Sequence, residues 1–336
     1  PCALVLAAPS TAVAAIAVAA RHGILIKGSG FLEHLADVSS VVFDKTGTLT
    51  TGALVLDDPG ALDGLAPDAM AALHDLVARS GHPKSAAIRE ALERRGPPLD
   101  PRALVVEHPG LGVEMLRDSR RWRLGEPSWV SASACAGDCA FGVDGTLVAA
   151  VRTTERLRGD AVPELRALAK DGVEVWMLSG DDPERVRAAA VHAGIPAERA
   201  LGGRSPRDKA SFLAGVDRRD TLLVGDGVND ALALDRAYVS GTPAVDRPYI
   251  PARADFFFVT PGLAPVRLAL RSARVLAQVV RVDLAIALAY NALAIGFALA
   301  GRMSPLLCAV LMPASSLTTI GATVAALSAR SRPWRS

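Results

Sequence analysis

The stretch Ser40-Val-Val-Phe-Asp-Lys-Thr-Gly-Thr-Leu-Thr50 decides how this chain folds and where its chemistry lies. Its β-branched and aromatic beginning favours a buried strand, and that strand ends on one carboxylate, Asp44. Gly47 follows in a turn whose backbone N–H groups can hold the oxygens of a phosphoryl group. A carboxylate in this place can attack the phosphorus atom. We therefore predict that Asp44 is a nucleophile, flanked by Lys45 and Thr46.

Two later segments, 173–178 and 221–224, repeat the pattern of an apolar run that ends in glycine and aspartate. Helical patterns lie between the runs, at 160–170, 182–193 and 207–216. Strands that alternate with helices form a parallel sheet, whose ligand-binding loops lie together at the carboxyl edge. The sequence therefore predicts one site built from Asp44, Ser179, Asp181, Lys209, Asp226 and Asp230.

Each of these side chains meets one requirement of phosphoryl transfer. Ser179, next to Gly180 and Asp181, can offer a hydroxyl to a phosphate oxygen, and Lys209 can neutralise developing charge. Asp226 and Asp230 share one short loop, and their carboxylates suit the hard ion Mg²⁺. Each motif alone is usually a turn or a surface ion pair. The ordered set at the strand ends predicts a phosphoryl-transfer site that uses Mg²⁺.

The apolar residues are concentrated near the two ends of the 336-residue chain. Half of all residues are hydrophobic but only 4% are aromatic, and the longest apolar runs are 2–20, 282–300 and 305–327. About 20 apolar residues cross the hydrocarbon core of a bilayer. We expect a partial transmembrane helix at 1–20 and a transmembrane helical hairpin at 261–329. Arginines flank the hairpin, which places the charged middle of the chain in the cytoplasm. The net charge of +2 gives no case for a nucleic-acid partner.

The motif Asp44-Lys-Thr-Gly-Thr-Leu-Thr50 resembles the phosphorylation motif of the P-type ATPases. The resemblance implies an α/β haloacid dehalogenase-like phosphorylation domain, at 38–52 and 149–260, with an inserted α+β nucleotide-binding domain at 53–148. Phosphatases of that fold carry a second Asp two residues after the nucleophile, where this chain has Thr46. Without that acid–base group an aspartyl phosphate should persist, as a pump requires. The resemblance also implies that the chain is a fragment without the family's actuator domain and earlier membrane helices.

Two motifs in the expected insert resemble the nucleotide site of the heavy-metal class. His82-Pro83 is similar to that class's His-Pro motif, where the histidine lies against adenine, and Gly110 and Gly112 are similar to its glycine pair. The resemblance implies ATP as the nucleotide. Family members usually have an acidic residue before the histidine, and this chain has Gly81, so its contacts with the purine differ.

Candidate ion ligands interrupt all three apolar runs. Pro1-Cys2 resembles the end of the Cys-Pro-Cys motif of heavy-metal pumps, and Tyr290-Asn291 and Met312 with Ser316 resemble the copper subgroup. Thiolate and thioether groups select Cu⁺. A Zn²⁺ or Cd²⁺ exporter is the alternative, but such pumps are expected to carry a Lys and an Asp in these helices. Asp283 lies at the cytoplasmic edge of its span, where we expect it to reach the interface.

Two interpretations from other classes compete with the copper pump, and one further pair of residues could form a metal site. A soluble phosphatase of the same fold predicts an acid in place of Thr46 and no apolar spans. A non-enzymatic membrane scaffold predicts loss of the nucleophile, of Lys209 or of Asp226. Cys135 and Cys139 could bind a metal, but no second pair or histidine cluster accompanies them, so reduced structural thiols are favoured. We therefore expect a bacterial plasma-membrane pump with cytoplasmic catalytic domains, and with a metallochaperone as a further partner.

Overall fold

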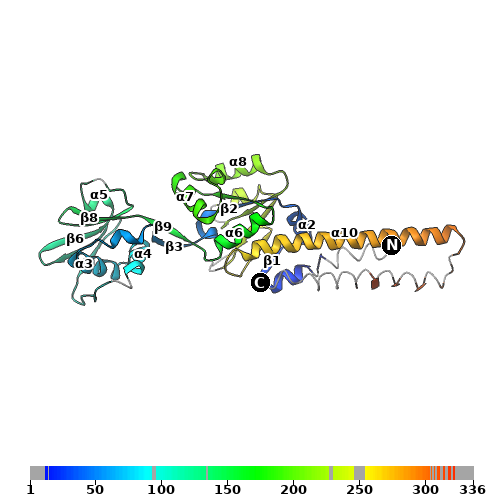
Figure 1. The fold of residues 1–336 in the computed structure, drawn as a ribbon, viewed down its shortest axis with the longest axis horizontal. Helices are drawn as coiled ribbons and strands as arrows, with labels where there is room; N and C mark the ends of the chain where they lie inside the picture. Colours follow the sequence, from blue (N-terminus) through cyan, green and yellow to red (C-terminus); the bar gives the residue numbers. More distant parts are fainter. Residues whose placement is uncertain are drawn as a thin grey trace. The chain divides into compact units, whose positions relative to one another are not determined.

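The computed structural model describes residues 12–13, 15–92, 96–133, 135–226, 230–245 and 254–302, together with single positions up to 321. The chain divides into two compact units. We call residues Thr50–Leu157 the inserted unit, and Pro1–Leu49 with Arg158–Ser336 the core unit. Figure 1 shows the elements of each unit.

The core unit is built around a seven-stranded sheet in the order β1-β14-β13-β12-β2-β10-β11. Only β1 is antiparallel to its neighbour, and every other pair is parallel. The strands are β1 (Ile24–Ile26), β2 (Ser40–Asp44), β10 (Glu174–Leu178), β11 (Ala200–Leu201), β12 (Thr221–Val224), β13 (Val239–Pro243) and β14 (Phe256–Phe258).

The register of this sheet brings the three predicted strand ends together. In β10, Leu178 pairs with Asp44, and in β12, Val224 pairs with Phe43. The loops that follow β2, β10 and β12 therefore leave the sheet side by side at one edge. This confirms the predicted parallel sheet, and the physical cause is that all three apolar runs are buried as neighbouring central strands.

Helices connect the parallel strands and cover the sheet. Leu213 of α8 and Leu234 of α9 pack with Val42 and Leu223 of the sheet in one apolar cluster. The helical segments of the core unit are α2 (Ser29–Asp37), α6 (Ala161–Lys170), α7 (Pro183–Ala193), η3 (Ala197–Arg199), α8 (Pro206–Val216), α9 (Ala231–Leu234) and α10 (Ala264–Leu299). The helices expected at 160–170, 182–193 and 207–216 correspond to α6, α7 and α8.

Ion pairs attach the first turns of α10 to the rest of the core unit. The Arg267 guanidinium donates to both carboxylate oxygens of Glu164, at 2.6 and 2.9 Å. The Arg271 guanidinium does the same with Asp171, at 2.7 and 2.8 Å. These hydrogen bonds lower the pKa of Asp171 and raise that of Arg271. Bidentate pairs of this kind fix orientation as well as contact, so α10 continues from the sheet as a docked helix.

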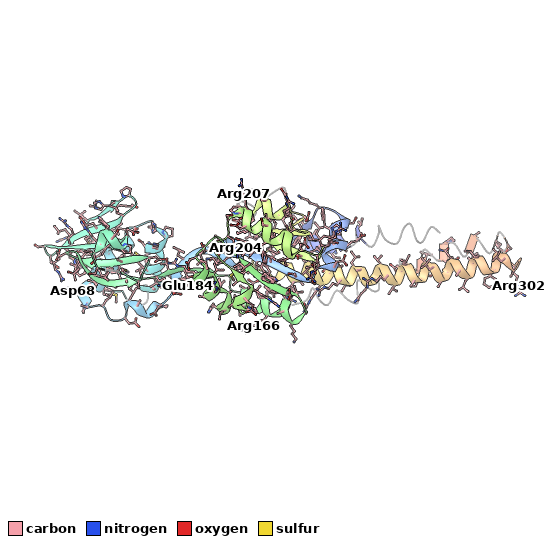
Figure 2. All side chains as sticks on the ribbon, turned by 90° about the horizontal axis from the view of Figure 1, so that it is seen from above. Asp68, Arg166, Glu184, Arg204, Arg207 and Arg302 are labelled. Atoms are coloured by element: carbon pink, nitrogen blue, oxygen red, sulfur yellow. The ribbon has the colours of Figure 1, made fainter. Side chains whose placement is uncertain are left out.

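Among the described residues, α10 is the one helix that is long and apolar enough to cross a membrane. It is a single 36-residue helix with a mean hydropathy of 1.8 in its most apolar window, of which 11% is buried. The arginines at 267–281 and the apolar run that follows them are thus one continuous element. Figure 2 shows its side chains projecting outward as far as Arg302, just beyond the last turn. Most residues of the expected partial helix at 1–20 and of the second arm of the hairpin lie outside the described residues.

The inserted unit joins an antiparallel sheet of order β4-β5-β6-β7-β8 to helices α3 and α4. Trp122 stacks on Phe141 within its core, with ring centroids 5.4 Å apart. Its elements are β3 (Thr50–Leu56), η2 (Pro59–Leu62), α3 (Pro67–Ala78), α4 (Pro83–Leu92), β4 (Val105–His108), β5 (Gly112–Arg117), β6 (Arg120–Gly125), α5 (Pro127–Val130), β7 (Cys139–Val143), β8 (Thr146–Val151) and β9 (Thr153–Leu157).

The inserted unit is longer at both ends than the expected 53–148. Strands β3 and β9 pair with each other in an antiparallel ribbon, and the Thr50 hydroxyl donates to Glu155 at 2.6 Å. Both passages of the chain therefore belong to this unit, so its limits are Thr50 and Leu157. The discontinuous domain expected at 38–52 and 149–260 is correspondingly shorter at its two inner ends.

Candidate active site

The Asp44 carboxylate lies at the end of β2 in contact with one lysine. Asp44 is 5% exposed, and its Oδ1 accepts a hydrogen bond from Lys209 Nζ at 2.5 Å. Lys209 belongs to the first turn of α8. A reciprocal cap between Ser205 and Asp208 fixes the beginning of that helix. The cap therefore sets the direction in which Lys209 leaves the helix.

The same ammonium group also binds a second carboxylate. Lys209 Nζ donates to Asp230 Oδ1 at 2.8 Å, so Lys209 bridges two buried acids. Asp230 is 1% exposed, and its Oδ2 has no hydrogen-bond partner among the described residues. Gly225 makes this approach of Asp230 to the end of β12 feasible, because a Cβ there would lie 2.7 Å from Oδ2.

The electrostatics of the three groups follow from burial and from their mutual charges. Burial, reinforced by the charge of Asp230, raises the pKa of Asp44 from 3.8 to about 7, although Lys209 acts in the opposite direction. Burial alone would lower the pKa of the Lys209 ammonium, but the charges of Asp44 and Asp230 outweigh it and raise that pKa. Lys209 is therefore a permanent cation, whereas Asp44 changes charge near neutrality.

The Ser179-Gly-Asp181 loop lies next to the loop after Asp44, as predicted. Lys45, which is buried, forms an ion pair with Asp181 that joins the two loops. The buried Ser179 hydroxyl oxygen accepts the Asp181 backbone N–H at 3.2 Å and keeps its own proton available for donation. Ser179 thus lies where the sequence predicts it, and Lys45 gains a defined role as the link between β2 and β10.

We call Lys45–Leu49 the Asp44 loop, a tight turn in which Thr46 and Gly47 are not helical and Thr46 is exposed. Arg158 holds this loop from a distant part of the chain. Its guanidinium Nε donates to the Thr48 carbonyl at 2.8 Å, and its Nη2 donates to the Gly47 carbonyl at 3.2 Å. Sequence reasoning missed Arg158, because a lone arginine more than a hundred residues away carries no local signal.

Asp226 and Asp230 could supply some, but not all, of the ligands that a magnesium ion needs. Asp230 Oδ2 is a buried acceptor without a hydrogen bond, and the charge of Asp226 is near enough to raise the pKa of Asp44. Within the described part of the chain no three potential ligands already converge on one metal position. Mg²⁺ is usually held by one or two carboxylates, with water and substrate phosphates completing its shell. This donor set is of the right kind for that ion.

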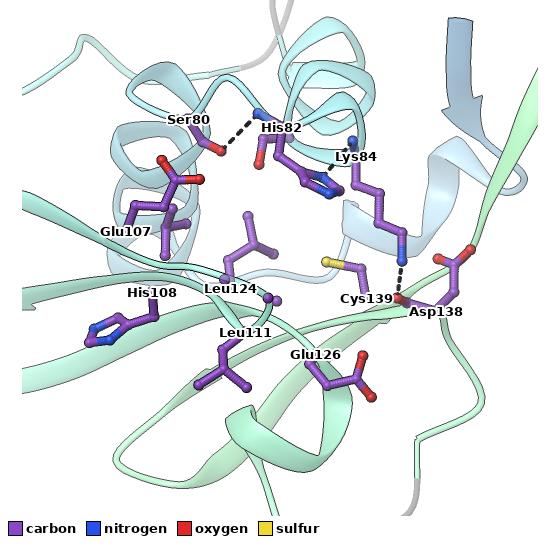
Figure 3. Close-up of a pocket in the computed structure, with 15 residues that line it drawn as sticks. Ser80, His82, Lys84, Glu107, His108, Leu111, Leu124, Glu126, Asp138 and Cys139 are labelled. Carbon is purple, nitrogen blue, oxygen red and sulfur yellow. Dashed lines mark hydrogen bonds between the residues drawn. The ribbon is translucent and has the colours of Figure 1, made fainter. Parts of the chain in front are cut away.

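A separate cavity of about 190 Å³ lies in the inserted unit (Figure 3). His82, at the beginning of α4 beside Pro83, lines it together with the backbone of Gly110 and Gly112. The Lys84 backbone N–H donates to His82 Nδ1 at 3.2 Å, so the neutral ring carries its proton on Nε2. The predicted nucleotide residues His82, Gly110 and Gly112 are thus brought to one cavity.

Gly110 and Gly112 have different structural roles in the wall of this cavity. Gly110 has a left-handed φ of 76°, and a Cβ there would meet nothing within 4 Å. A Cβ on Gly112 would lie 2.2 Å from the Leu124 carbonyl oxygen and 2.7 Å from Gly125 Cα. Gly112 and Gly125 are directly paired across β5 and β6. Gly112 is therefore required by the close approach of two strands, whatever the cavity holds.

Sequence reasoning missed most of the polar side chains in the cavity wall. They come from segments far apart in the sequence, and only Ser80 belongs to the predicted His-Pro motif: Ser80, Lys84, Glu107, Glu126, Asp138 and Cys139. Cys135 and Cys139 are both free, and burial raises the pKa of the Cys139 thiol to about 12. A thiol of that kind stays protonated, which agrees with the structural role favoured for this pair.

The candidate ion ligands are only partly within the described residues. Tyr290 and Asn291 are half-buried on α10, on the same helical face as the buried Ala287. Cys2, Met312 and Ser316 lie outside the described residues. Asp283 is 2% exposed, so the expectation that it reaches toward the interface is wrong. The helix turns it onto the buried face, four residues before Ala287.

Comparison with known proteins identifies the family of the core unit. A family model described as haloacid dehalogenase-like hydrolase matches residues 38–237. The chain therefore belongs to the haloacid dehalogenase-like hydrolase family.

Two curated proteins are similar to almost the whole of this chain. The nitrogen fixation protein FixI of Bradyrhizobium diazoefficiens is 36% identical over 332 residues, which cover 94% of this chain and 44% of that protein. The copper-exporting P-type ATPase of Mycobacterium tuberculosis is 34% identical, over 95% of this chain and 44% of that protein. The chain thus spans less than half the length of these curated relatives.

A solved structure shows the same arrangement of elements. The crystal structure of a zinc-transporting PIB-type ATPase in the E2.Pi state matches with a TM-score of 0.84 and 25% identity. The match covers 97% of this chain and 56% of that one. The resemblance to heavy-metal P-type ATPases is therefore confirmed, as is the haloacid dehalogenase-like fold with its inserted domain and apolar helix.

Proposed function

We propose that this chain is the catalytic part of an ATP-driven heavy-metal pump that phosphorylates itself on Asp44. The observation that carries the proposal is the Lys209 ammonium, which bridges the buried carboxylates of Asp44 and Asp230 at 2.5 and 2.8 Å. A buried cation between two acids at the end of a parallel strand suits the charge that develops during phosphoryl transfer.

The transfer follows from the positions of the side chains. An ionised Asp44 oxygen forms a bond to the γ-phosphorus of ATP, the bond from that phosphorus to the bridging oxygen breaks, and ADP leaves. Lys209 remains charged throughout and balances the transferred oxygens, while Ser179 can donate to one of them. Asp226 and Asp230 would hold Mg²⁺, and the ion would supply neutralisation of the phosphate charge.

The aspartyl phosphate is expected to last because no acid–base group follows Asp44 closely. Thr46, the exposed residue two positions later, has a hydroxyl that does not ionise near neutrality. Water is therefore not activated from that position. This is the property that separates a pump from a phosphatase of the same fold. Relatives named as metal-transporting ATPases support the choice of a pump.

The transported ion proposed is Cu⁺. The supporting facts are the soft ligands Cys2 and Met312, the Tyr290-Asn291 pair on α10 and a copper-exporting relative. A Zn²⁺ or Cd²⁺ pump remains the competing proposal, because a zinc-transporting neighbour shares the fold. The apolar outer part of α10 supports placement in a bilayer, which we propose is a bacterial plasma membrane. A metallochaperone is proposed as the donor of the ion.

The phosphorylation chemistry is tested on the chain with γ-labelled ATP and Mg²⁺. We expect an acid-stable, hydroxylamine-sensitive label that is abolished by Asp44→Asn and reduced at least a hundredfold in rate by Asp226→Ala. The matched control is Glu198→Gln, an exposed acid of the same unit, which should label normally. A label that survives in Asp44→Asn contradicts the assignment of the nucleophile.

The identity of the ion is tested on the natural gene product in membranes, with a strong thiol present. ATP hydrolysis should be stimulated by Cu⁺ and by its chemical mimic Ag⁺. Cys2→Ser and Met312→Ala should each remove the stimulation and leave nucleotide binding unchanged. Stimulation by Zn²⁺ or Cd²⁺ but not by Cu⁺ would overturn the copper proposal, and the phosphorylation chemistry would stand.

A further inference from the structure

The cavity in the inserted unit is about the size of one planar ring system, and its wall carries more acidic than basic side chains. Its volume of about 190 Å³ is smaller than the roughly 300–1,000 Å³ of a pocket that encloses a drug-sized ligand. It therefore suits the base of a nucleotide better than the whole molecule. Its wall contains the carboxylates of Glu107, Glu126 and Asp138, and one ammonium group, that of Lys84.

Some polar groups of this wall are already engaged, whereas two of its carboxylates, those of Glu107 and Glu126, have no hydrogen bond or ion pair with a described residue. Lys84 Nζ donates to the Asp138 carbonyl at 2.5 Å, and the Ser80 hydroxyl oxygen accepts the His82 backbone N–H at 3.3 Å. The Glu107 side chain makes no hydrogen bond or ion pair with any described residue, as is also true of Glu126 at the other end of the cavity. Glu107 extends from β4, three residues before Gly110, and is exposed to solvent.

The position of Glu107 distinguishes it from the other acids. Figure 3 shows its carboxylate beside Ser80 at one end of the cavity, near the His82 side, while Lys84, Asp138 and Glu126 lie toward the other end. A triphosphate is repelled by an uncompensated carboxylate and attracted by an ammonium group. The neutral base is therefore the part of a nucleotide that can approach Glu107.

An ionised carboxylate only accepts hydrogen bonds, so it selects a base by the donors that the base presents. The 6-amino group of adenine is a donor, whereas unsubstituted purine offers only a C–H at that position. We infer that Glu107 accepts a hydrogen bond from the 6-amino group of adenine and so determines which nucleotide this protein uses. This inference rests on the proposed function, in which the cavity holds the base of ATP.

The inference is tested by equilibrium binding of two nucleotides to the full chain. The probes are ATP and purine riboside triphosphate, which differs from ATP only by lacking the amino group. The wild-type chain should bind ATP on the order of tenfold or more tightly than the analogue, as expected for a hydrogen bond to a charged group. Glu107→Ala should reduce this preference below about threefold, through a loss of ATP affinity alone.

Two further variants separate base recognition from general loosening of the cavity. Glu107→Gln keeps an acceptor oxygen and should retain an intermediate preference, whereas Glu126→Ala should retain the whole preference. A uniform loss of affinity for both nucleotides in Glu107→Ala, with the ratio unchanged, overturns the role of Glu107 and leaves the proposed function standing. If Glu126→Ala, and not Glu107→Ala, reduces the preference for ATP over the analogue, the role of Glu107 is also overturned and the proposed function stands. Failure of the wild-type chain to bind either nucleotide overturns the proposed function itself.

Discussion

Replacing the nucleophile should make the core unit more stable. In the folded chain burial and the charge of Asp230 raise the pKa of Asp44 from 3.8 to about 7, so ionising Asp44 is costly there. At about 1.4 kcal/mol for each pKa unit, the folded state loses up to about 4 kcal/mol relative to the unfolded chain once Asp44 is fully ionised. Asp44→Asn removes that cost but weakens one hydrogen bond to Lys209. A net gain of about 1–4 kcal/mol is therefore expected.

The sign of the pH dependence follows from the raised pKa. Well below pH 3.8 the carboxyl group is protonated in both states, so its charge does not affect stability. As the pH rises toward 7, the unfolded chain gives up its proton first and wild-type stability falls. The advantage of Asp44→Asn over the wild-type chain should therefore be larger at pH 8 than at pH 5.

The measurement is thermal unfolding of the full chain in detergent, without Mg²⁺, at these two pH values. Hydrogen exchange of the peptide that contains β2 would assign the transition to the core unit. A gain of 1–4 kcal/mol corresponds to an increase of at least about 2 °C in the midpoint. Glu198→Gln, which removes an exposed carboxylate, should show no pH-dependent difference. A variant Asp44→Asn that melts at or below the wild-type temperature at pH 8 would refute the reasoning.

Three further predictions test other parts of the structure. Arg158→Ala, which removes both hydrogen bonds to the Asp44 loop, should slow phosphorylation about tenfold without changing nucleotide binding, measured by rapid-quench labelling. Arg271→Ala should destabilise the chain more at pH 7 than at pH 3. The Arg271 hydrogen bonds lower the pKa of Asp171, and the stability that this contributes is lost as the pH falls below 3.8 and through the lowered pKa; melting curves at both pH values check this. Iodoacetamide at pH 8 should modify Cys135 in the native chain and spare Cys139, whose thiol pKa is about 12; mass spectrometry of the peptides decides.

Much of the core unit could be predicted from the sequence because its signals are local. The runs that became β2, β10 and β12 are short, apolar and bounded by glycine and aspartate, and helical patterns separate them. Those features alone require a parallel sheet with three acidic loops at one edge. The apolar run within α10 was likewise evident from composition.

The limits of the inserted unit were harder to predict, because they depend on contacts between distant residues. Strand β3 finds its partner β9 about a hundred residues later, and neither has a strong alternating pattern of its own. The same holds for the cavity. Ser80, Lys84 and Glu107 come from different elements, and only the packing of α4 against the sheet brings them to one wall.

The sequence by itself determined which groups take part in the chemistry: a strand-end carboxylate, a serine, a lysine and two further acids. Only the tertiary structure decided how these groups act on one another. Lys209 bridges Asp44 and Asp230, which are separated by more than 180 residues, and Lys45 joins Asp181 across two strands. Residue types follow from local sequence, but the pKa of a buried carboxylate depends on burial and on charges that only folding brings within a few ångströms.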